Sequence, residues 1–212
     1  MPRFLIVLDV DSTLIEDEVI ELLADAAGSR ERVADITSRA MAGELDFATS
    51  LAERVATLEG LPASVFDDVR SRLTPTRGVR DLVDGVHAAG GLVGVVSGGF
   101  HETLDPLADD LGLDFRRANR LELHDGRLTG RVAGPVVDAR AKADSLRGWA
   151  EEARVDLAHT VAVGDGANDL EMMAVAALSV AFNAKPTVRR RADVVVGTND
   201  LSQVLPLLGL RG

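Results

Sequence analysis

The stretch Phe4-Leu5-Ile6-Val7-Leu8-Asp9-Val10-Asp11-Ser12-Thr13 decides the fold of this chain. Five consecutive apolar residues are typical of a strand that is buried on both faces, and two carboxylates follow directly at its end. Carboxylates this close repel each other, so a divalent cation or a pair of acid and nucleophile would explain them. A turn rich in Asp and Ser would explain them as well, and this segment alone leaves both interpretations open.

A second apolar run also ends in acidic residues, because Thr160-Val161-Ala162-Val163 continues into Gly164-Asp165-Gly166-Ala167-Asn168-Asp169. Glycines let the backbone turn sharply at such a strand end. Two acidic strand ends in one chain suggest a single shared cation site, which weakens the turn interpretation.

A candidate phosphate site lies between these two segments. The run Val93-Gly94-Val95-Val96 continues into Ser97-Gly98-Gly99-Phe100. A hydroxyl and glycine amides that open a helix would form a phosphate cradle. Lys142 lies in a helical pattern at 139–152, and taken alone it would be an ordinary solvated lysine.

Short apolar runs alternate with helical patterns in most of the chain, which predicts an α/β fold with a parallel sheet covered by helices on both faces. A β-hairpin is predicted at 120–130, where residues of alternating character flank Asp125-Gly126. The predicted strands are 3–9, 92–96, 114–117, 160–164, 178–181 and 193–196, and the predicted helices are 78–89, 101–112, 139–154, 168–176, 186–192 and 201–208.

Residues 14–75 break this alternation, because they hold helical patterns separated by Gly and Pro and no convincing strand. We therefore expect a core made of 1–13 and 76–212, with 14–75 as a small helical cap inserted after the first strand. An insert at this position lies above the end of that strand and can close over it. The helices expected in the cap are 14–27, 30–41, 47–58 and 64–73.

The composition excludes several classes of protein. The net charge of −11 argues against binding nucleic acid or an anionic membrane through a basic face, and the lack of cysteine excludes disulfides and thiol chemistry. No run approaches the roughly 18 apolar residues of a transmembrane helix. The five apolar residues before Asp9 are too few for a signal peptide, so a cytoplasmic location is expected.

In this order, the four motifs resemble those of the haloacid dehalogenase superfamily of aspartate-nucleophile phosphotransfer enzymes, and most closely those of its members that act on phosphoserine. The resemblance covers nearly the whole chain. It implies a Rossmann-like doubly wound sheet with a small cap, and Mg²⁺-dependent hydrolysis of O-phospho-L-serine to L-serine, the last step of serine biosynthesis. Besides the four motifs it rests on Glu18, Met41-Ala42-Gly43, Phe47, Ser50-Leu51, Arg54-Val55, Leu73-Thr74-Pro75-Thr76, Ala118-Asn119-Arg120-Leu121 and Ala184-Lys185-Pro186.

The resemblance also implies roles for the motif residues. Asp9 would be the nucleophile that forms an aspartyl-phosphate, and Asp11 the general acid and base. Mg²⁺, which prefers hard oxygen ligands, would bind the carboxylates of Asp9 and Asp165 and the backbone carbonyl of Asp11. Asp169 would orient Lys142 or a metal-bound water. The phosphate would be held by Ser97, Gly98, Gly99, Lys142 and Asn168.

The other end of the substrate would meet the cap. By resemblance, Glu18 would receive the ammonium group, Arg54 would bind the carboxylate bidentately, and Met41 and Phe47 would form an apolar lid. Judged by spacing alone, the two charged residues would more often be surface charges and the two apolar ones cap core.

Three other functions stay open at this point. A phosphotransferase would pass the phosphate from Asp9 to another alcohol such as homoserine and would share every motif. A phosphoamino-acid binding module without catalysis is disfavoured, because both Asp9 and Asp11 are present. A broader phosphatase is disfavoured by Glu18 and Arg54, because sugar phosphates offer no ammonium or carboxylate to match them.

Overall fold

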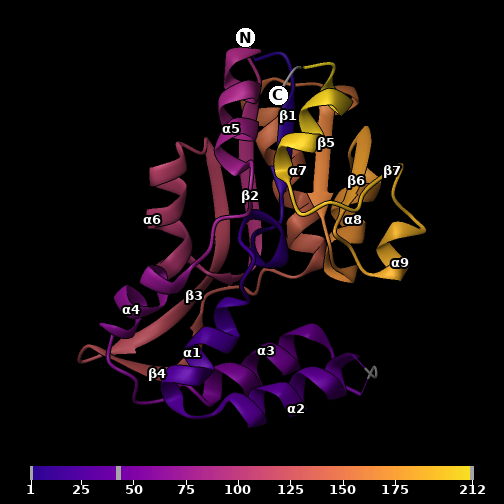
Figure 1. The fold of residues 1–212 in the computed structure, drawn as a ribbon. Coiled ribbons are helices and arrows are strands. Elements are labelled where there is room, and N and C mark those ends of the chain that lie inside the picture. Colours follow the sequence, from indigo (N-terminus) through magenta and orange to yellow (C-terminus); the bar gives the residue numbers. More distant parts are fainter. Residues whose placement is uncertain (1, 42–43, 211–212) are drawn as a thin grey trace.

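The computed structural model describes residues 2–41 and 44–210, except for the side chain of Met41. Within them, seven strands form one sheet in the order β4-β3-β2-β1-β5-β6-β7, with β4 antiparallel to β3 and the other neighbours parallel (Figure 1). The α/β fold class expected from the sequence is therefore confirmed. The strands are β1 Leu5–Leu8, β2 Leu92–Phe100, β3 Phe115–His124, β4 Arg127–Ala133, β5 Thr160–Gly164, β6 Leu178–Phe182 and β7 Val194–Val196.

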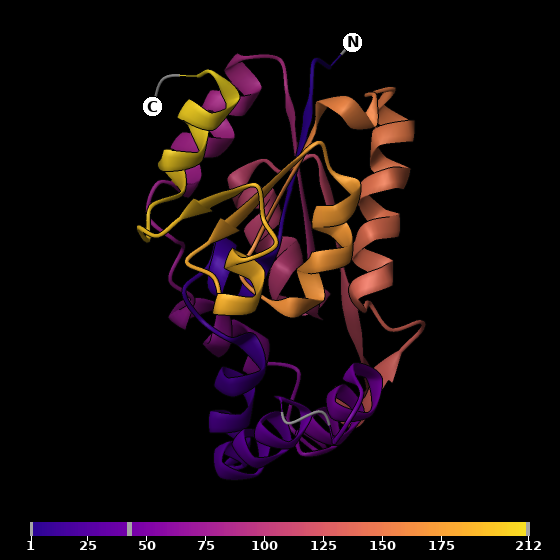
Figure 2. The same ribbon diagram turned by 90° about the vertical axis from the view of Figure 1, so that its right-hand side faces the viewer.

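Helices cover both faces of the sheet. The described helices are α1 Val19–Ala27, α2 Arg30–Met41, α3 Phe47–Ala56, α4 Val65–Arg72, α5 Val79–Ala88, α6 His101–Leu111, α7 Ala139–Ala153, α8 Leu170–Val175 and α9 Pro186–Arg189, with short helical turns η1 Val10–Leu14, η2 Leu157–His159, η3 Ala167–Asp169 and η4 Leu201–Leu208. Figure 2 shows the sheet between α5 and η4 on one side and α7 and α8 on the other.

The apolar run of β1 explains why this strand lies at the centre. All four of its residues are fully buried, and they alternate between two hydrophobic clusters. Ile6 and Leu8 contribute to the cluster on the α5 and α6 side, and Leu5 and Val7 to the cluster on the α7 and α8 side. Successive side chains of a strand point to opposite faces, so a continuous apolar run is what a two-sided core requires.

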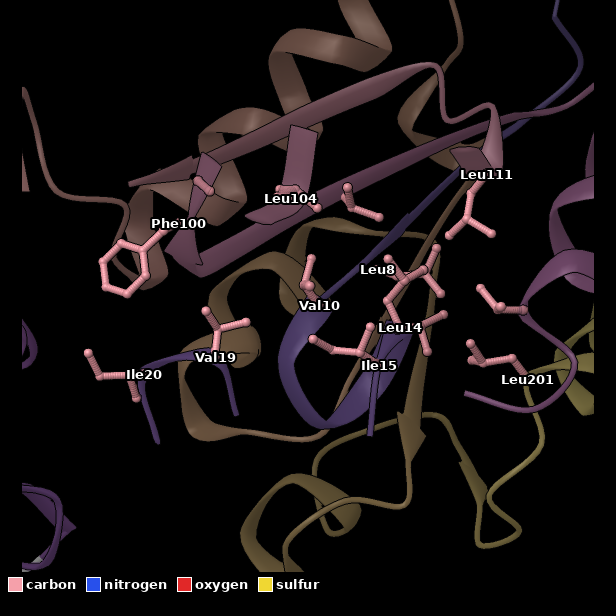
Figure 3. Packing of buried hydrophobic residues seen from close by; sticks show 14 of the residues in the cluster. Leu8, Val10, Leu14, Ile15, Val19, Ile20, Phe100, Leu104, Leu111 and Leu201 are labelled. Carbon is pink, nitrogen blue, oxygen red and sulfur yellow. The ribbon is translucent and has the colours of Figure 1, made fainter. Parts of the chain in front are cut away.

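The first of these clusters continues from the sheet into the helices at 15–75. Figure 3 shows Leu8 of β1 and Leu104 of α6 in the same cluster as Val19 and Ile20 of α1. Helices α1 to α3 lie beyond the ends of the central strands (Figure 1). The two connections to these helices pair with each other, since Ile15 and Pro75 form an antiparallel bridge. The division into a core and a cap at 14–75 stays a prediction.

The predicted hairpin is confirmed and is longer than expected. β3 and β4 are antiparallel, and the turn residues Asp125 and Gly126 both have positive φ (49° and 73°), as a two-residue hairpin turn requires. β3 begins at Phe115 and so also includes residues 115–117 of the separately predicted strand 114–117. The hairpin reaches the loop between α3 and α4, where Gly60 donates to the Leu128 carbonyl (2.8 Å) and Leu128 donates to the Leu61 carbonyl (2.9 Å).

Two predicted boundaries are corrected. β2 continues through Phe100, so Ser97, Gly98 and Gly99 lie at the end of a strand and the helix opens only at His101. The first cap helix begins at Val19 and not at residue 14, because 10–14 form a tight loop in which Ser12 has φ of 58°. None of the described helices has the length and apolar character needed to cross a membrane. The cytoplasmic location stays a prediction.

Candidate active site

The two acidic strand ends meet at one edge of the sheet. β1 pairs in parallel with β5, with Leu8 opposite Val163, and Asp9 donates its backbone N–H to the Val163 carbonyl (2.9 Å). Asp9 and Asp165 therefore follow neighbouring strands at the same edge. On the other side β2 pairs with β1, with Leu8 opposite Val95, which brings Ser97 to this edge as well.

Lys142 reaches this edge from α7. Its Nζ lies 2.6 Å from Asp9 Oδ1 and 2.7 Å from Asp169 Oδ1, and its side chain is only 1% exposed. Asp138 is the N-cap residue just before α7, and its Oδ1 accepts from the Ala141 amide (2.8 Å) in the first turn of the helix. Burial alone would lower the pKa of Lys142, but the carboxylates of Asp169 and Asp9 outweigh it and hold that pKa above its ordinary value.

One lysine does not balance the three carboxylates here. Burial and the charge of Asp169 raise the pKa of Asp9 to about 7, against the opposing effect of Lys142. Burial and Asp169 likewise raise the pKa of Asp165 to about 6. Carboxylate oxygens of Asp9, Asp165 and Asp169 lie within 4.8 Å of one another. This excess of buried negative charge and its all-oxygen donor set fit a divalent cation.

Asp169 is less suited to bind that cation directly than its two neighbours. Its Oδ2 accepts from the amides of Gly166 (3.0 Å) and Asp165 (3.2 Å), and its Oδ1 accepts from Lys142. Both oxygens are therefore already engaged. A side chain at Gly164 would collide with the Asp169 carboxylate, which explains a glycine at the end of β5.

Asp11 lies in the loop that follows Asp9. Within the described residues its Oδ1 is buried without a hydrogen-bond partner. Burial, together with the charges of Glu18 and Asp9, raises the pKa of Asp11 well above its usual value. A Cβ at position 99 would lie 3.2 Å from Asp11 Oδ2, so Gly99 allows this carboxyl group to approach the end of β2 closely.

The end of β2 is held in place by the buried side-chain amide of Asn119, a residue with no role predicted from the sequence. Asn119 of β3 donates from Nδ2 to the Gly98 carbonyl (2.8 Å), and its Oδ1 accepts from the Val137 amide (2.8 Å). The β2–β3 ladder is irregular between Val96 and Phe100, so Asn119 replaces a bond that the ladder lacks. Ser97 Oγ accepts from the Gly99 amide (2.7 Å), which leaves its hydroxyl hydrogen free to donate.

The helices at 15–75 supply the opposite wall. Glu18 Oε1 accepts from Ser12 Oγ (2.7 Å). Arg54 Nε donates to the Ser50 carbonyl (3.2 Å), and burial lowers the pKa of Arg54 while the charges of Glu18 and Asp11 oppose that shift. A Cβ at Gly98 would lie 2.9 Å from Phe47 Cζ, so the phenyl ring rests directly on the end of β2. The side chain of Met41 lies outside the described residues.

A cavity of about 650 Å³ joins the two walls. Lys142 and Asp169 do not line it, because they are buried next to Asp9. Ser50 lines it but was given no role from the sequence, although its spacing from Phe47 and Arg54 marks one helix face. The predicted residues that line it are Asp9, Asp11, Glu18, Phe47, Arg54, Ser97, Gly98, Gly99, Asp165 and Asn168.

Comparisons with known proteins agree on one family. Residues 6–174 match the family model described as haloacid dehalogenase-like hydrolase. A phosphoserine phosphatase of Streptomyces coelicolor is 56% identical over 206 residues, which are 97% of this chain and 50% of that protein. A phosphoserine phosphatase of Streptococcus thermophilus is 50% identical over 96% of this chain and 95% of that protein. This chain thus spans half the length of the first relative and nearly all of the second.

Solved structures give the same result. A structure described as a phospho-aspartyl intermediate analogue of phosphoserine phosphatase superposes with a TM-score of 0.92 at 41% identity and covers 98% of this chain and 99% of its own. A substrate-bound phosphoserine phosphatase has the same TM-score at 40% identity, with the same coverage.

Proposed function

This chain belongs to the family of haloacid dehalogenase-like hydrolases, and we propose that it hydrolyses O-phospho-L-serine to L-serine and phosphate. The observation that carries the proposal is one cavity with the Asp9 and Asp11 pair at one wall and Glu18 and Arg54 at the other. A phosphorylated amino acid carries a phosphate at one end and an ammonium and a carboxylate at the other, and so matches this distribution of charge.

Asp9 would act as the nucleophile. Its Oδ1 accepts from the Val10 amide (2.7 Å) and lies against Lys142, which orients the carboxylate and leaves Oδ2 to attack phosphorus. The bond from Asp9 to phosphorus forms as the bond from phosphorus to the serine oxygen breaks. Water then attacks the aspartyl-phosphate, and the Asp9 carboxylate and inorganic phosphate are released.

Asp11 would move the protons. Burial and the charges of Glu18 and Asp9 raise the pKa of Asp11, which favours the protonated form that can give a proton to the leaving serine oxygen. The resulting carboxylate then accepts a proton from the attacking water. Asp11 ends the cycle protonated, as it began.

Asp9 and Asp165 would hold Mg²⁺ through carboxylates, with the backbone carbonyl of Asp11 as a third ligand. When bound, this cation supplies the positive charge that lets a carboxylate approach a phosphate dianion. Without it, each pair of like unit charges 4 Å apart would repel by roughly 4 kcal/mol at an effective dielectric constant of about 20. Asp169 would act through Lys142 and the amides of Asp165 and Gly166.

The phosphate would receive hydrogen bonds from Ser97, from the amide of Gly98 and from Asn168. The amide of Gly99 already donates to Ser97 Oγ and would hold that hydroxyl in place for the phosphate. Lys142 would stabilise the charge that collects around Asp9. Asn119 donates to the Gly98 carbonyl and so holds in place the backbone at the end of β2, next to these phosphate donors.

Residues 14–75 would form a cap over the core made of 1–13 and 76–212. Glu18 would bind the substrate ammonium and Arg54 its carboxylate, and the contact of Phe47 with Gly98 would exclude water from the phosphate. Met41 is proposed for the same lid from the sequence alone.

The test is phosphate release from O-phospho-L-serine by the purified protein with Mg²⁺. We expect turnover that stops with EDTA, returns with Mg²⁺, and is slower for O-phosphoethanolamine, which lacks the carboxylate. Turnover that persists in EDTA would refute the cation site. Added homoserine tests transfer to a second alcohol, which is not favoured because the relatives described above are named as phosphatases.

A further inference from the structure

Ser50 is a buried polar residue in the wall of the cavity that the mechanism above does not use. It is 2% exposed, and among the described residues its Oγ has no hydrogen-bond partner. The backbone of Ser50 does bond to the Asp46 carbonyl one turn earlier (3.0 Å), but its hydroxyl does not. A buried hydroxyl without a partner is costly, so a serine at this position calls for a partner beyond the described residues.

The position of Ser50 on α3 indicates what that partner is. Phe47, Ser50 and Arg54 are three and four residues apart, so they share one face of the helix, and all three line the cavity. Phe47 rests on Gly98, at the end of the cavity proposed for the phosphate. Ser50 therefore lies between the phosphate end and the guanidinium of Arg54.

Arg54 is positioned by the same residue. Its Nε donates to the Ser50 carbonyl, and it takes part in none of the ion pairs formed by the described residues. Its terminal nitrogens therefore lack a carboxylate partner among these residues. A carboxylate bound there has lone pairs beyond those that a guanidinium can occupy, and the Ser50 hydroxyl is a donor on the same helix face that has no partner among the described residues.

We propose that Ser50 is a specificity-determining residue whose hydroxyl donates a hydrogen bond to the substrate carboxylate held by Arg54. The inference rests on the proposed function and deepens it. The hydroxyl gains its partner only when a phosphate ester with a carboxylate enters, so Ser50 favours O-phospho-L-serine over esters without that group.

The test compares two substrates in Ser50→Ala. We expect kcat/KM for O-phospho-L-serine to fall about tenfold, mainly through KM, the size expected for one hydrogen bond to a charged group. The value for O-phosphoethanolamine should change less than twofold. Ser50→Cys keeps the size of the side chain but is a weak donor. It should also lower the ratio of kcat/KM for O-phospho-L-serine to kcat/KM for O-phosphoethanolamine. Thr49→Ala removes an exposed hydroxyl from the neighbouring position and should leave kcat/KM unchanged for both substrates.

The outcomes separate this proposal from the one on which it rests. A wild-type protein with no preference for O-phospho-L-serine would refute the proposed function itself. A clear wild-type preference that survives in Ser50→Ala would overturn only the role of Ser50, as would an equal loss on both substrates. In an Arg54→Ala background, Ser50→Ala should have less than a twofold further effect, because the carboxylate is then no longer held in place.

Discussion

The core wall of the cavity, formed at the ends of β1, β2 and β5, differs from the cap wall, formed by the helices at 15–75, in how its charged groups are paired within the protein. In the core wall, Asp9 and Asp169 share Lys142, and backbone amides bind the remaining oxygens of Asp169. In the cap wall, Arg54 has no ion pair among the described residues and the Ser50 hydroxyl has no partner there. The Lys142 contacts of the core wall are thus formed within the protein, although Asp11 Oδ1 in that wall has no partner among the described residues. In the cap wall, we propose that the substrate completes the pairing of Arg54 and Ser50. Reaction chemistry needs fixed geometry, and recognition needs unpaired groups that only the correct ligand can pair.

The largest effect is expected for Asp9→Asn, which removes the nucleophile and keeps the size of the side chain. Phosphate release should fall about a thousandfold or more, while the far-UV circular dichroism spectrum stays that of the wild type. Phosphate release at the wild-type rate would show that Asp9 is not the nucleophile and that the reaction does not take place at the core wall.

Lys142→Met should reduce both stability and activity. Removing one partner of a buried ion pair leaves unbalanced carboxylates at Asp9 and Asp169, so unfolding by urea should show a loss of about 3–5 kcal/mol. Arg140→Met, at an exposed position of the same helix, is the control and should lose less than about 1 kcal/mol. Equal losses would show that the core wall does not depend on this lysine.

Arg54→Ala tests the cap wall alone. We expect kcat/KM for O-phospho-L-serine to fall about a hundredfold, because a bidentate carboxylate contact is lost. For O-phosphoethanolamine the loss should be less than about threefold. If both substrates lost activity to the same degree, the two walls would not divide reaction from recognition as described here.

The last prediction concerns the pH dependence of Mg²⁺ binding at the core wall. In the metal-free protein the pKa of Asp9 is raised to about 7 and that of Asp165 to about 6, so below these values protons compete with the cation. Affinity measured by isothermal titration calorimetry should therefore weaken as the pH falls through 7 and then 6, by up to about tenfold per unit for each proton displaced. Affinity that stays constant over this range would place the cation elsewhere.

Sequence alone was sufficient for the features that depend on local pattern. The apolar run before Asp9 specifies a two-sided buried strand, and Asp125-Gly126 supplies the two positive φ angles of the hairpin turn. The apolar runs that end in acidic residues mark Asp9 and Asp165 as residues that follow the ends of strands. Each of these follows from side-chain periodicity or backbone preference over a few residues.

Tertiary structure decided everything that depends on distances between remote segments. Only the fold brings Lys142 into contact with Asp9 and Asp169, attaches Asn119 to the Gly98 carbonyl, and leaves the Ser50 hydroxyl without a partner. It also decided that Ser97, Gly98 and Gly99 continue a strand, because glycine has little preference of its own and pairing with neighbouring strands determines its conformation. Local pattern determines which face of an element is buried, but hydrogen bonds and ion pairs form between elements and are set by how those elements pack.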